Sequence, residues 1–316
     1  MNWRGEIGKR LRDSQVRFDV PLRELTTLRI GGPADCLVDV ESEGDLLALL
    51  AWLESEGVPF VLIGKGSNLL APDAGLRGVA IRLGRGLSTV QRRAGTAFVL
   101  AGAGLANAAY VSRCRELGLG GMEYLVAIPG TIGGAVAMNA GAHDGETAAF
   151  LEHVRFYERG SGIRTCAAGE FPFAYRSSPL RGQLGRVVVA AEFRMREMSP
   201  ETIRSREADF QEYRRRTQPR EFPNCGSIFK NPAGDFAGRL VEQAGLKGHR
   251  LRGAQVSDKH ANFIVNREGA NAADVLELID LLRESVYQEA GVGLELEMQV
   301  MDTEGRFASP AQPERR

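Results

Sequence analysis

The stretch FPNCGSIFKNP, residues 222–232, places three chemically active side chains within six positions. Cys225 carries a thiol, Ser227 a hydroxyl and Lys230 an ammonium group, and the prolines on either side restrict the backbone. A glycine followed by a serine is common in plain turns as well as in reactive sites, so the stretch alone does not choose between them. Because the sequence offers no base near Cys225, we interpret this thiol as a packing residue.

Two glycine-rich loops have the composition of phosphate-binding loops. GKGSN, residues 64–68, follows an apolar run typical of a buried strand, and IPGTIGGAVAMNAGA, residues 128–142, is apolar and rich in glycine. Glycine lets backbone N–H groups approach a ligand closely. The Walker and GxGxxG patterns are both missing. From chemistry alone, a dinucleotide-type cofactor and plain structural turns are equally good interpretations, and the second loop reads as neither helix nor strand.

The composition describes an ordinary globular protein with no strong overall charge. The chain has 316 residues, enough for two or three domains, and its 40 basic and 40 acidic residues cancel. We therefore expect neither nucleic-acid binding nor membrane insertion, and the charged amino end does not resemble a signal peptide. Four cysteines and four histidines are scattered without metal-ligand spacing, so we expect a cytoplasmic protein without a metal site.

The periodicity of apolar residues predicts alternating helices and strands, with a polar helical segment, residues 199–219, at a domain boundary. The expected helices are residues 42–57, 105–117, 235–245 and 271–291, the last with apolar positions Val275, Leu278, Ile279, Leu282 and Val286. The expected strands are residues 61–63, 78–83, 153–159, 185–195, 227–230, 260–266 and 294–301.

Nine short motifs, in order along residues 21–301, together resemble one family. They are TTLRIGGPA, IGKGSNLL, IPGTIGGAVAMNAGA, YRSS, RRRTQP, GSIFKNP, AGLKG, SDKHANFIVN and LELEMQV. The chain resembles the UDP-N-acetylenolpyruvoylglucosamine reductases of peptidoglycan synthesis, flavoenzymes also called MurB. The YRSS motif, without a long tyrosine-bearing loop, is similar to the type II branch.

This resemblance implies an α+β protein. Its FAD-binding fold would be of the vanillyl-alcohol oxidase, or PCMH, type in two subdomains, followed by a C-terminal α+β substrate domain. We expect an N-terminal extension at residues 1–20, FAD-binding subdomains at 21–84 and 85–198, a substrate-binding domain at 199–303, and a disordered tail at 304–316.

The resemblance also implies the reaction and the cofactors. FAD would be bound non-covalently, NADPH would be the reductant, and the substrate would be the enolpyruvyl ether UDP-N-acetyl-3-O-(1-carboxyvinyl)-glucosamine. We expect a monomer that yields UDP-N-acetylmuramate. The implied cofactor-binding residues are Gly64, Lys65, Gly66, Ser67, Asn68, Pro129, Gly130, Thr131, Gly133, Gly134 and Ala140.

Three residues match the catalytic positions of the family. Hydride addition to the enolpyruvyl group leaves negative charge on the neighbouring carbon, so a proton donor and a cation for the carboxylate are needed. Ser227 matches the proton donor, and Arg176 in FAYRSSPL matches the arginine that binds the carboxylate. Glu297 matches the glutamate, which either hydrogen-bonds the enolate when protonated or orients Arg176 when ionised.

Substrate contacts are implied at four further positions, Lys230, Asn231, Lys247 and Lys259. Gln299 stands where many relatives have a basic residue, which departs from the pattern. Two alternatives stay open at this point. A sugar or alcohol oxidase of the same fold would often attach flavin through a histidine, and His143 is the nearest one to the glycine-rich loops. A non-catalytic nucleotide-binding homologue would keep the fold without the chemistry.

Overall fold

The computed structural model describes residues 3–143, 145–181 and 185–307, which form two compact units. Unit 1 consists of residues 1–18, 36–65 and 78–214, and unit 2 of residues 19–35, 66–77 and 215–316, as far as they are described. Two N-terminal segments thus belong to the unit that contains the C-terminal part of the chain. The five predicted segments remain a prediction, and residues 308–316 of the predicted tail lie outside the described residues.

The first sheet has four strands in the order β1-β2-β5-β3, with β3 parallel to β5. It is packed against helix α2, which begins where the Ser42 hydroxyl accepts the Asp45 N–H at 3.1 Å. The apolar side of α2 is fully buried with the inner strand residues, so burial fixes this layer. The elements are β1 (Gln15–Pro21), β2 (Pro33–Val40), α2 (Glu43–Ser55), β3 (Phe60–Leu62) and β5 (Leu76–Leu83).

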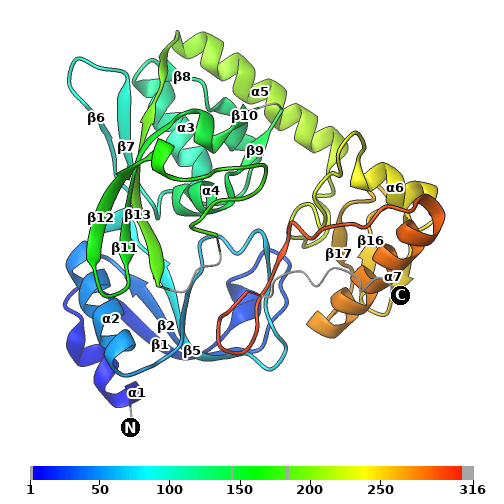
Figure 1. Ribbon diagram of the computed structural model, residues 1–316, viewed down its shortest axis with the longest axis horizontal. Coiled ribbons are helices and arrows are strands. Elements are labelled where there is room, and N and C mark those ends of the chain that lie inside the picture. The colour runs from blue at the N-terminus through cyan, green and yellow to red at the C-terminus, as the bar shows by residue number, and fades with distance from the viewer. Residues whose placement is uncertain (1–2, 144, 182–184, 308–316) are drawn as a thin grey trace. The chain divides into compact units, whose positions relative to one another are not determined.

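The second sheet, also mainly in unit 1, has five antiparallel strands in the order β12-β11-β13-β7-β6. Figure 1 shows α3 and α4 beside strands β7 and β13, where their apolar side chains join Phe156 and Phe193 in one buried core. The elements are β6 (Val90–Arg92), β7 (Phe98–Gly102), α3 (Asn107–Glu116), α4 (Ile132–Met138), β11 (Leu151–Glu158), β12 (Gly162–Ala167) and β13 (Arg186–Arg194).

The expectation that the second glycine-rich loop forms no helix is wrong, because α4 lies inside it. The Thr131 hydroxyl caps this helix by accepting the Gly134 N–H at 3.3 Å. A Cβ on Gly133 would lie 3.0 Å from the Ala103 Cβ, so glycine allows the helix to pack closely on the chain after β7. Burial of Ile132, Ala135 and Val136 outweighs the cost of about 1 kcal/mol that each helical glycine carries.

Unit 2 packs two helices against a three-stranded antiparallel sheet, and Figure 1 shows α6, α7, β16 and β17 close together. The five predicted apolar positions of α7 are all buried, which confirms the predicted face. A separate parallel pair joins β18 to β4. The elements are β4 (Leu69–Leu70), α6 (Ala237–Gln243), β15 (Arg250–Leu251), β16 (Ala254–Val256), β17 (Ile264–Asn266), α7 (Ala272–Ala290) and β18 (Gln299–Val300).

The α-helices and strands not yet named include one long helix and several short elements. The polar boundary segment forms one long helix, α5, whose residues are divided between the two units. The remaining α-helices and strands are α1 (Trp3–Glu6), β8 (Leu119–Gly120), β9 (Gly141–Ala142), β10 (Gly145–Glu146), β14 (Arg196–Glu197) and α5 (Pro200–Thr217).

The strands predicted at residues 227–230 and 294–301 are shorter than expected. Only one isolated antiparallel bridge, Phe229 to Leu296, joins these segments, and β18 covers just two residues. The other edge of Phe229 is occupied by the Asn262 side chain, which accepts the Phe229 N–H at 2.9 Å and donates to its carbonyl at 2.8 Å. A buried side chain thus replaces a third strand and keeps the ladder short.

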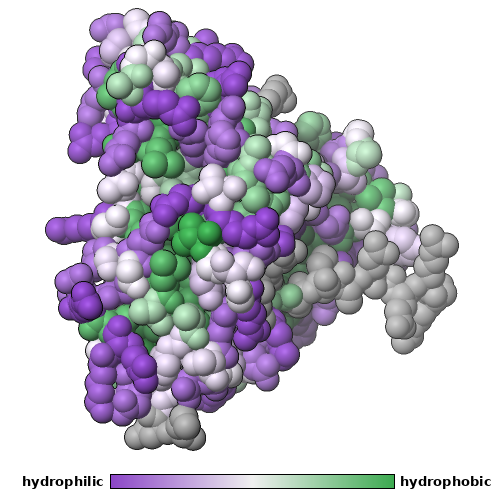
Figure 2. Space-filling view, turned by 60° about the vertical axis from the view of Figure 1, so that its left-hand side comes forward, coloured by the Kyte–Doolittle hydropathy of each residue, from purple (hydrophilic) through white to green (hydrophobic). Residues whose placement is uncertain are grey.

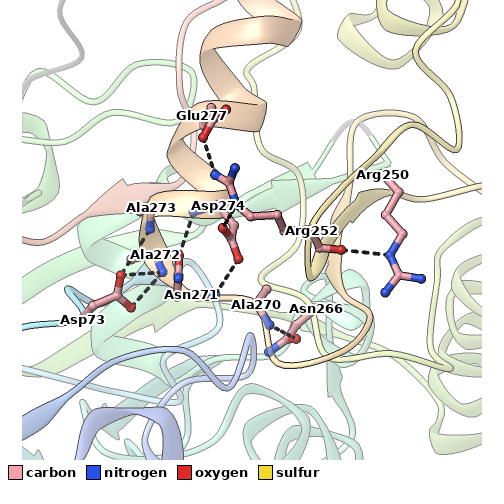
Figure 3. Close-up of polar contacts among 10 residues, drawn as sticks. All are labelled: Asp73, Arg250, Arg252, Asn266, Ala270, Asn271, Ala272, Ala273, Asp274 and Glu277. Atoms are coloured by element: carbon pink, nitrogen blue, oxygen red, sulfur yellow. Dashed lines mark hydrogen bonds and ion pairs between the residues drawn. The ribbon is translucent and has the colours of Figure 1, made fainter.

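A polar network fixes the start of α7, as Figure 3 shows. The Asp73 carboxylate accepts the N–H groups of Ala272 and Ala273, at 2.8 and 3.2 Å. Asn271 caps the helix by accepting the Asp274 N–H at 2.8 Å, and Asp274 accepts the Asn271 N–H in return. The loop after β4 and the longest helix of unit 2 are therefore held together by charge-assisted hydrogen bonds.

Among the described residues, no helix is long and apolar enough to cross a membrane. Figure 2 shows one face of the molecule, on which hydrophilic residues cover most of the surface and apolar residues form patches among them.

We predict that Asp73→Ala lowers the free energy of unfolding by about 1–2 kcal/mol, because two helix N–H groups lose their acceptor. Urea titration of both variants measures the change. Asp280→Ala, an exposed position within the same helix, is the matched control and should shift the midpoint much less. Equal effects of the two substitutions would show that the Asp73 contact adds nothing to stability.

Candidate active site

The first glycine-rich loop turns sharply between β3 and β4. Gly64 and Lys65 are exposed, whereas Gly66 is buried and has a φ of +58°. A Cβ on Gly66 would lie 2.1 Å from the Leu25 carbonyl oxygen, so only glycine fits there. The close approach at Gly66 is thus to the chain's own backbone.

The two glycine-rich loops meet in unit 1. A Cβ on Gly64 would lie 2.8 Å from the Thr131 hydroxyl oxygen. Gly134 is exposed, and a Cβ there would meet only that same oxygen, at 3.6 Å. Gly64, Thr131 and Gly134 therefore form a small face without side-chain bulk, which we call the glycine face. It fits a ligand that approaches along the backbone, as a flavin nucleotide does.

Not every amide of the second loop is available to a ligand. The N–H groups of Ile132 and Gly133 donate to the carbonyls of Leu105 and Ala103, each at 2.9 Å. These two amides therefore bond the start of α4 to the chain between β7 and α3. Gly133 as a cofactor contact stays a prediction, and packing is a sufficient reason for a glycine there.

Arg176 lies on a tight turn in unit 1, residues 174–177. The Ala174 and Ser177 backbones bond each other twice at 3.0 Å, and Arg176 has a φ of +52°, a strained value for a residue with a side chain. Its guanidinium donates to the Gly141 carbonyl at 2.5 Å and lies over the Tyr175 ring. The turn therefore presents Arg176 at the end of the second glycine-rich loop.

Asn139 is the residue that links that loop to the Arg176 turn, and sequence reasoning gave it no structural role. It is fully buried and left-handed, with a φ of +43°. Its side-chain amide donates to the Ala174 carbonyl at 3.0 Å and to Glu146 at 3.1 Å. Asparagine just after a helical segment is a known left-handed cap, so the sequence did carry that signal.

The segments that carry Ser227 and Glu297 pair through their backbones in unit 2, and Asn68 bonds the second of them. The Glu297 N–H donates to the Ile228 carbonyl at 2.8 Å. The Asn68 side chain donates to the Glu297 carbonyl at 3.1 Å, and the Asn68 carbonyl accepts the Gln299 N–H at 3.0 Å. A predicted cofactor-loop residue thus holds the segment that carries the predicted glutamate beside the predicted serine.

Thr27 also belongs to this cluster. It lies in the motif TTLRIGGPA, but the motif predicted no contact for it. Its hydroxyl donates to the Asn224 carbonyl at 2.7 Å, and its N–H donates to the Gly66 carbonyl at 3.1 Å. One threonine therefore joins the GKGSN loop to the serine segment. Nothing local in the sequence predicts this, because the partners lie about 40 and 200 residues away.

Cys225 is buried, which confirms its interpretation as a packing residue. Its sulfur lies 3.2 Å from the Met298 sulfur, and burial raises the pKa of the thiol to about 12. Ser227 is only partly buried, because Gly226 with a φ of +83° turns the chain between them. The two side chains therefore differ in exposure, and only the serine is accessible.

The predicted substrate-binding residues also lie in unit 2. Lys230 forms an ion pair with Glu295, and Lys247 pairs with Glu242 at 2.9 Å. Lys259 donates to the Arg215 carbonyl at 2.8 Å, and the Asn231 side chain accepts the Ala237 N–H at 3.1 Å at the start of α6.

Two further residue types bear on cofactor chemistry. His143, the histidine nearest the glycine-rich loops, packs its ring against Phe210 and Tyr213 of α5. Within residues 3–143, 145–181 and 185–307 no group of three His, Cys, Asp or Glu side chains could hold a metal ion.

Comparison with known proteins identifies the class of this fold. Residues 34–166, which include β3 and β5 of the first sheet, β6, β7 and β11 of the second and the glycine face, match the model of the FAD binding domain family. The chain is therefore an FAD-dependent oxidoreductase with a PCMH-type FAD-binding fold. Residues 218–301 match a second model, described as the C-terminal domain of UDP-N-acetylenolpyruvoylglucosamine reductase.

The chain belongs to the UDP-N-acetylenolpyruvoylglucosamine reductase family. It is 43% identical to the enzyme of that name from Geobacter metallireducens, over 92% of this chain and 95% of the relative. It is 44% identical to that from an Anaeromyxobacter species, over 95% and 92%. The crystal structure of the MurB reductase from Thermus caldophilus is similar at a TM-score of 0.78 and 36% identity, covering 91% of this chain and 99% of that one. The predicted family, fold class and FAD cofactor are confirmed.

We predict that Cys166 is the only thiol to react rapidly with a disulfide reagent at pH 8 in the native protein. Cys36, Cys114 and Cys225 are buried, and burial raises the pKa of Cys114 and Cys225 to about 12, so these thiols stay protonated. Colorimetric thiol counting should give one fast group, which Cys166→Ser removes. A fast phase that Cys225→Ala removes instead would make Cys225 accessible and contradict the packing interpretation.

Proposed function

We propose that this chain reduces UDP-N-acetyl-3-O-(1-carboxyvinyl)-glucosamine to UDP-N-acetylmuramate with NADPH, in peptidoglycan synthesis. The observation that carries the proposal is the arrangement of Ser227 beside the Glu297 segment, in a chain that is 43% identical to a reductase over nearly its whole length. We further propose that the protein acts in the cytoplasm as a monomer.

FAD supplies the redox chemistry when it is bound, by carrying hydride from NADPH to the substrate. The residues that would hold it are those of the glycine face and its neighbours. Gly64, Lys65, Pro129 and Gly134 are exposed, and Gly64 and Gly134 lie beside Thr131, which agrees with a contact surface. Gly66, Ser67, Asn68, Gly130, Gly133 and Ala140 complete the proposed set.

Ser227 is proposed to give a proton to the carbon next to the substrate carboxylate. A hydroxyl is a weak acid against water, but a carbanion is basic enough to take its proton. The buried neighbours Cys225 and Ile228 fix the backbone on both sides of the serine, and the partly exposed hydroxyl stays accessible.

Arg176 and Glu297 are proposed to stabilise the negative charge on the substrate carboxylate and on the enolate that forms from it. A guanidinium can bind a carboxylate through two parallel hydrogen bonds and keeps its charge throughout the reaction. The strained turn and the bond to the Gly141 carbonyl would hold Arg176 ready for this, at the cost of backbone strain. Glu297 would either hydrogen-bond the enolate or orient the arginine.

We predict that Ser227→Ala retains FAD and is reduced by NADPH, but is reoxidised by the enolpyruvyl substrate about 10²–10⁴-fold more slowly, since it lacks the proton donor. Anaerobic single-turnover absorbance of the flavin separates the two half-reactions. Ser227→Cys should keep part of the activity, and Cys225→Ala serves as the packing control. A normal reoxidation rate for Ser227→Ala would remove the serine from its proposed role.

We predict that Gly134→Val folds but loses most of its FAD. The new side chain has room in the protein, where its Cβ meets only the Thr131 oxygen at 3.6 Å, yet it covers the glycine face. Flavin absorbance per chain after purification, with circular dichroism as the check on folding, measures this. Gly169→Val, at an exposed glycine whose Cβ would meet nothing within 4 Å, is the matched control. Full flavin content in both variants would place the cofactor elsewhere.

A further inference from the structure

Each of the three lysines expected to contact the UDP-sugar substrate has a glutamate as neighbour in unit 2. In every pair the lysine side chain is the more buried member, so the glutamate lies on the solvent side. The pairs and their side-chain exposures are Lys230–Glu295 with 14% and 55%, Lys247–Glu242 with 34% and 56%, and Lys259–Glu221, 4.0 Å apart, with 34% and 63%.

The Lys230–Glu295 pair is the most firmly built of these. The Lys230 N–H donates to the Glu295 carbonyl at 2.8 Å, next to the antiparallel bridge between Phe229 and Leu296. Phe229 and Leu296 are buried on one side of the two segments, so Lys230 and Glu295 face the other side as a direct cross-strand pair. Backbone pairing therefore fixes the two charges opposite each other.

Glu295 also shares its face with the proposed catalytic glutamate. Along residues 294–298 burial alternates, with Leu294, Leu296 and Met298 buried, Glu295 exposed and Glu297 half-buried. Two residues along an extended chain span about 7 Å. An anionic substrate on this face thus meets a second carboxylate, whose repulsion opposes binding.

We propose that Glu295 is the resident counter-ion of Lys230 and sets the affinity of that lysine for the phosphates of the nucleotide. This inference rests on the proposed function, because it takes Lys230 as a nucleotide contact. In the ligand-free protein the carboxylate occupies the lysine's accessible side. A phosphate that reaches the ammonium must share it with Glu295 or displace it, so binding weakens and product is released more readily.

The test measures the dissociation constant of UDP-N-acetylmuramate for the oxidised, FAD-loaded protein by isothermal titration calorimetry at low salt. Glu295→Gln keeps the shape and removes the charge, so this variant should bind roughly three- to tenfold more tightly. Glu295→Asp keeps the charge and should stay near wild type. Glu284→Gln, at an exposed glutamate of α7 bonded to Gln288, is the matched control and should not change binding.

A double-substitution cycle shows whether the effect acts through Lys230. Lys230→Met should weaken binding, and adding Glu295→Gln to it should then change the dissociation constant less than twofold. The difference between wild type and Glu295→Gln should also shrink at 0.5 M KCl, because salt screens exposed charges.

Three results would overturn the inference. If Glu295→Gln binds UDP-N-acetylmuramate as wild type does, the Lys230–Glu295 ion pair has no effect on the ligand. If this variant binds more weakly, Glu295 contacts the ligand or holds Lys230 in place. If Glu295→Gln still increases the affinity in the Lys230→Met background, its effect does not act through Lys230. If wild type binds no UDP-sugar at all, the proposed function itself fails, a result distinct from the first three because wild-type binding is measured first.

Discussion

The pairing of residues 228–230 with residues 295–297 is the constraint on which unit 2 depends. One bridge and its two flanking hydrogen bonds join segments nearly 70 residues apart, and Asn262 and Asn68 close their free edges. Two buried or partly buried amides therefore do the work that further strands do in a wider sheet. Side-chain and backbone groups of Asn262 and Asn68 bond both edges, so Ser227 and Glu297 lie, each partly buried, beside a short and fixed pair of segments.

Unit 1 contains most of the segment that matches the FAD binding domain family. The glycines of the two glycine-rich loops have different roles in the structure. Gly66, in unit 2, and Gly133, in unit 1, are glycines because the chain's own backbone and core approach them, whereas Gly64 and Gly134 of unit 1 leave open surface beside Thr131. Asn139 then ties the same loop to the Arg176 turn, so the proposed carboxylate-binding arginine is positioned by the loop that would hold the flavin.

Any charge that binds an anionic substrate must belong to particular side chains and not to the protein as a whole. A chain with 40 basic and 40 acidic residues has no overall field for an anionic substrate, so recognition must come from particular lysines and arginines. In the structure these cations already have acidic or carbonyl partners, such as Glu295 for Lys230 and Gly141 for Arg176. A cation held in this way has a defined position before ligand arrives, and its partner becomes part of the binding equilibrium.

The sequence by itself determined the family, the α+β fold class, the cofactor and the buried face of α7, because those depend on ordered motifs and on periodicity along one segment. It also gave the alternation of Leu294, Glu295 and Leu296, since a strand's two faces follow from a period of two. Tertiary structure alone decided that α4 forms within a glycine-rich loop, where burial outweighs weak helix propensity. It likewise decided that Asn262 and Thr27 organise the serine segment and that Glu295 faces Lys230. These contacts join residues that are distant in the chain, so no local pattern records them, and only the folded backbone brings the partners within hydrogen-bonding distance.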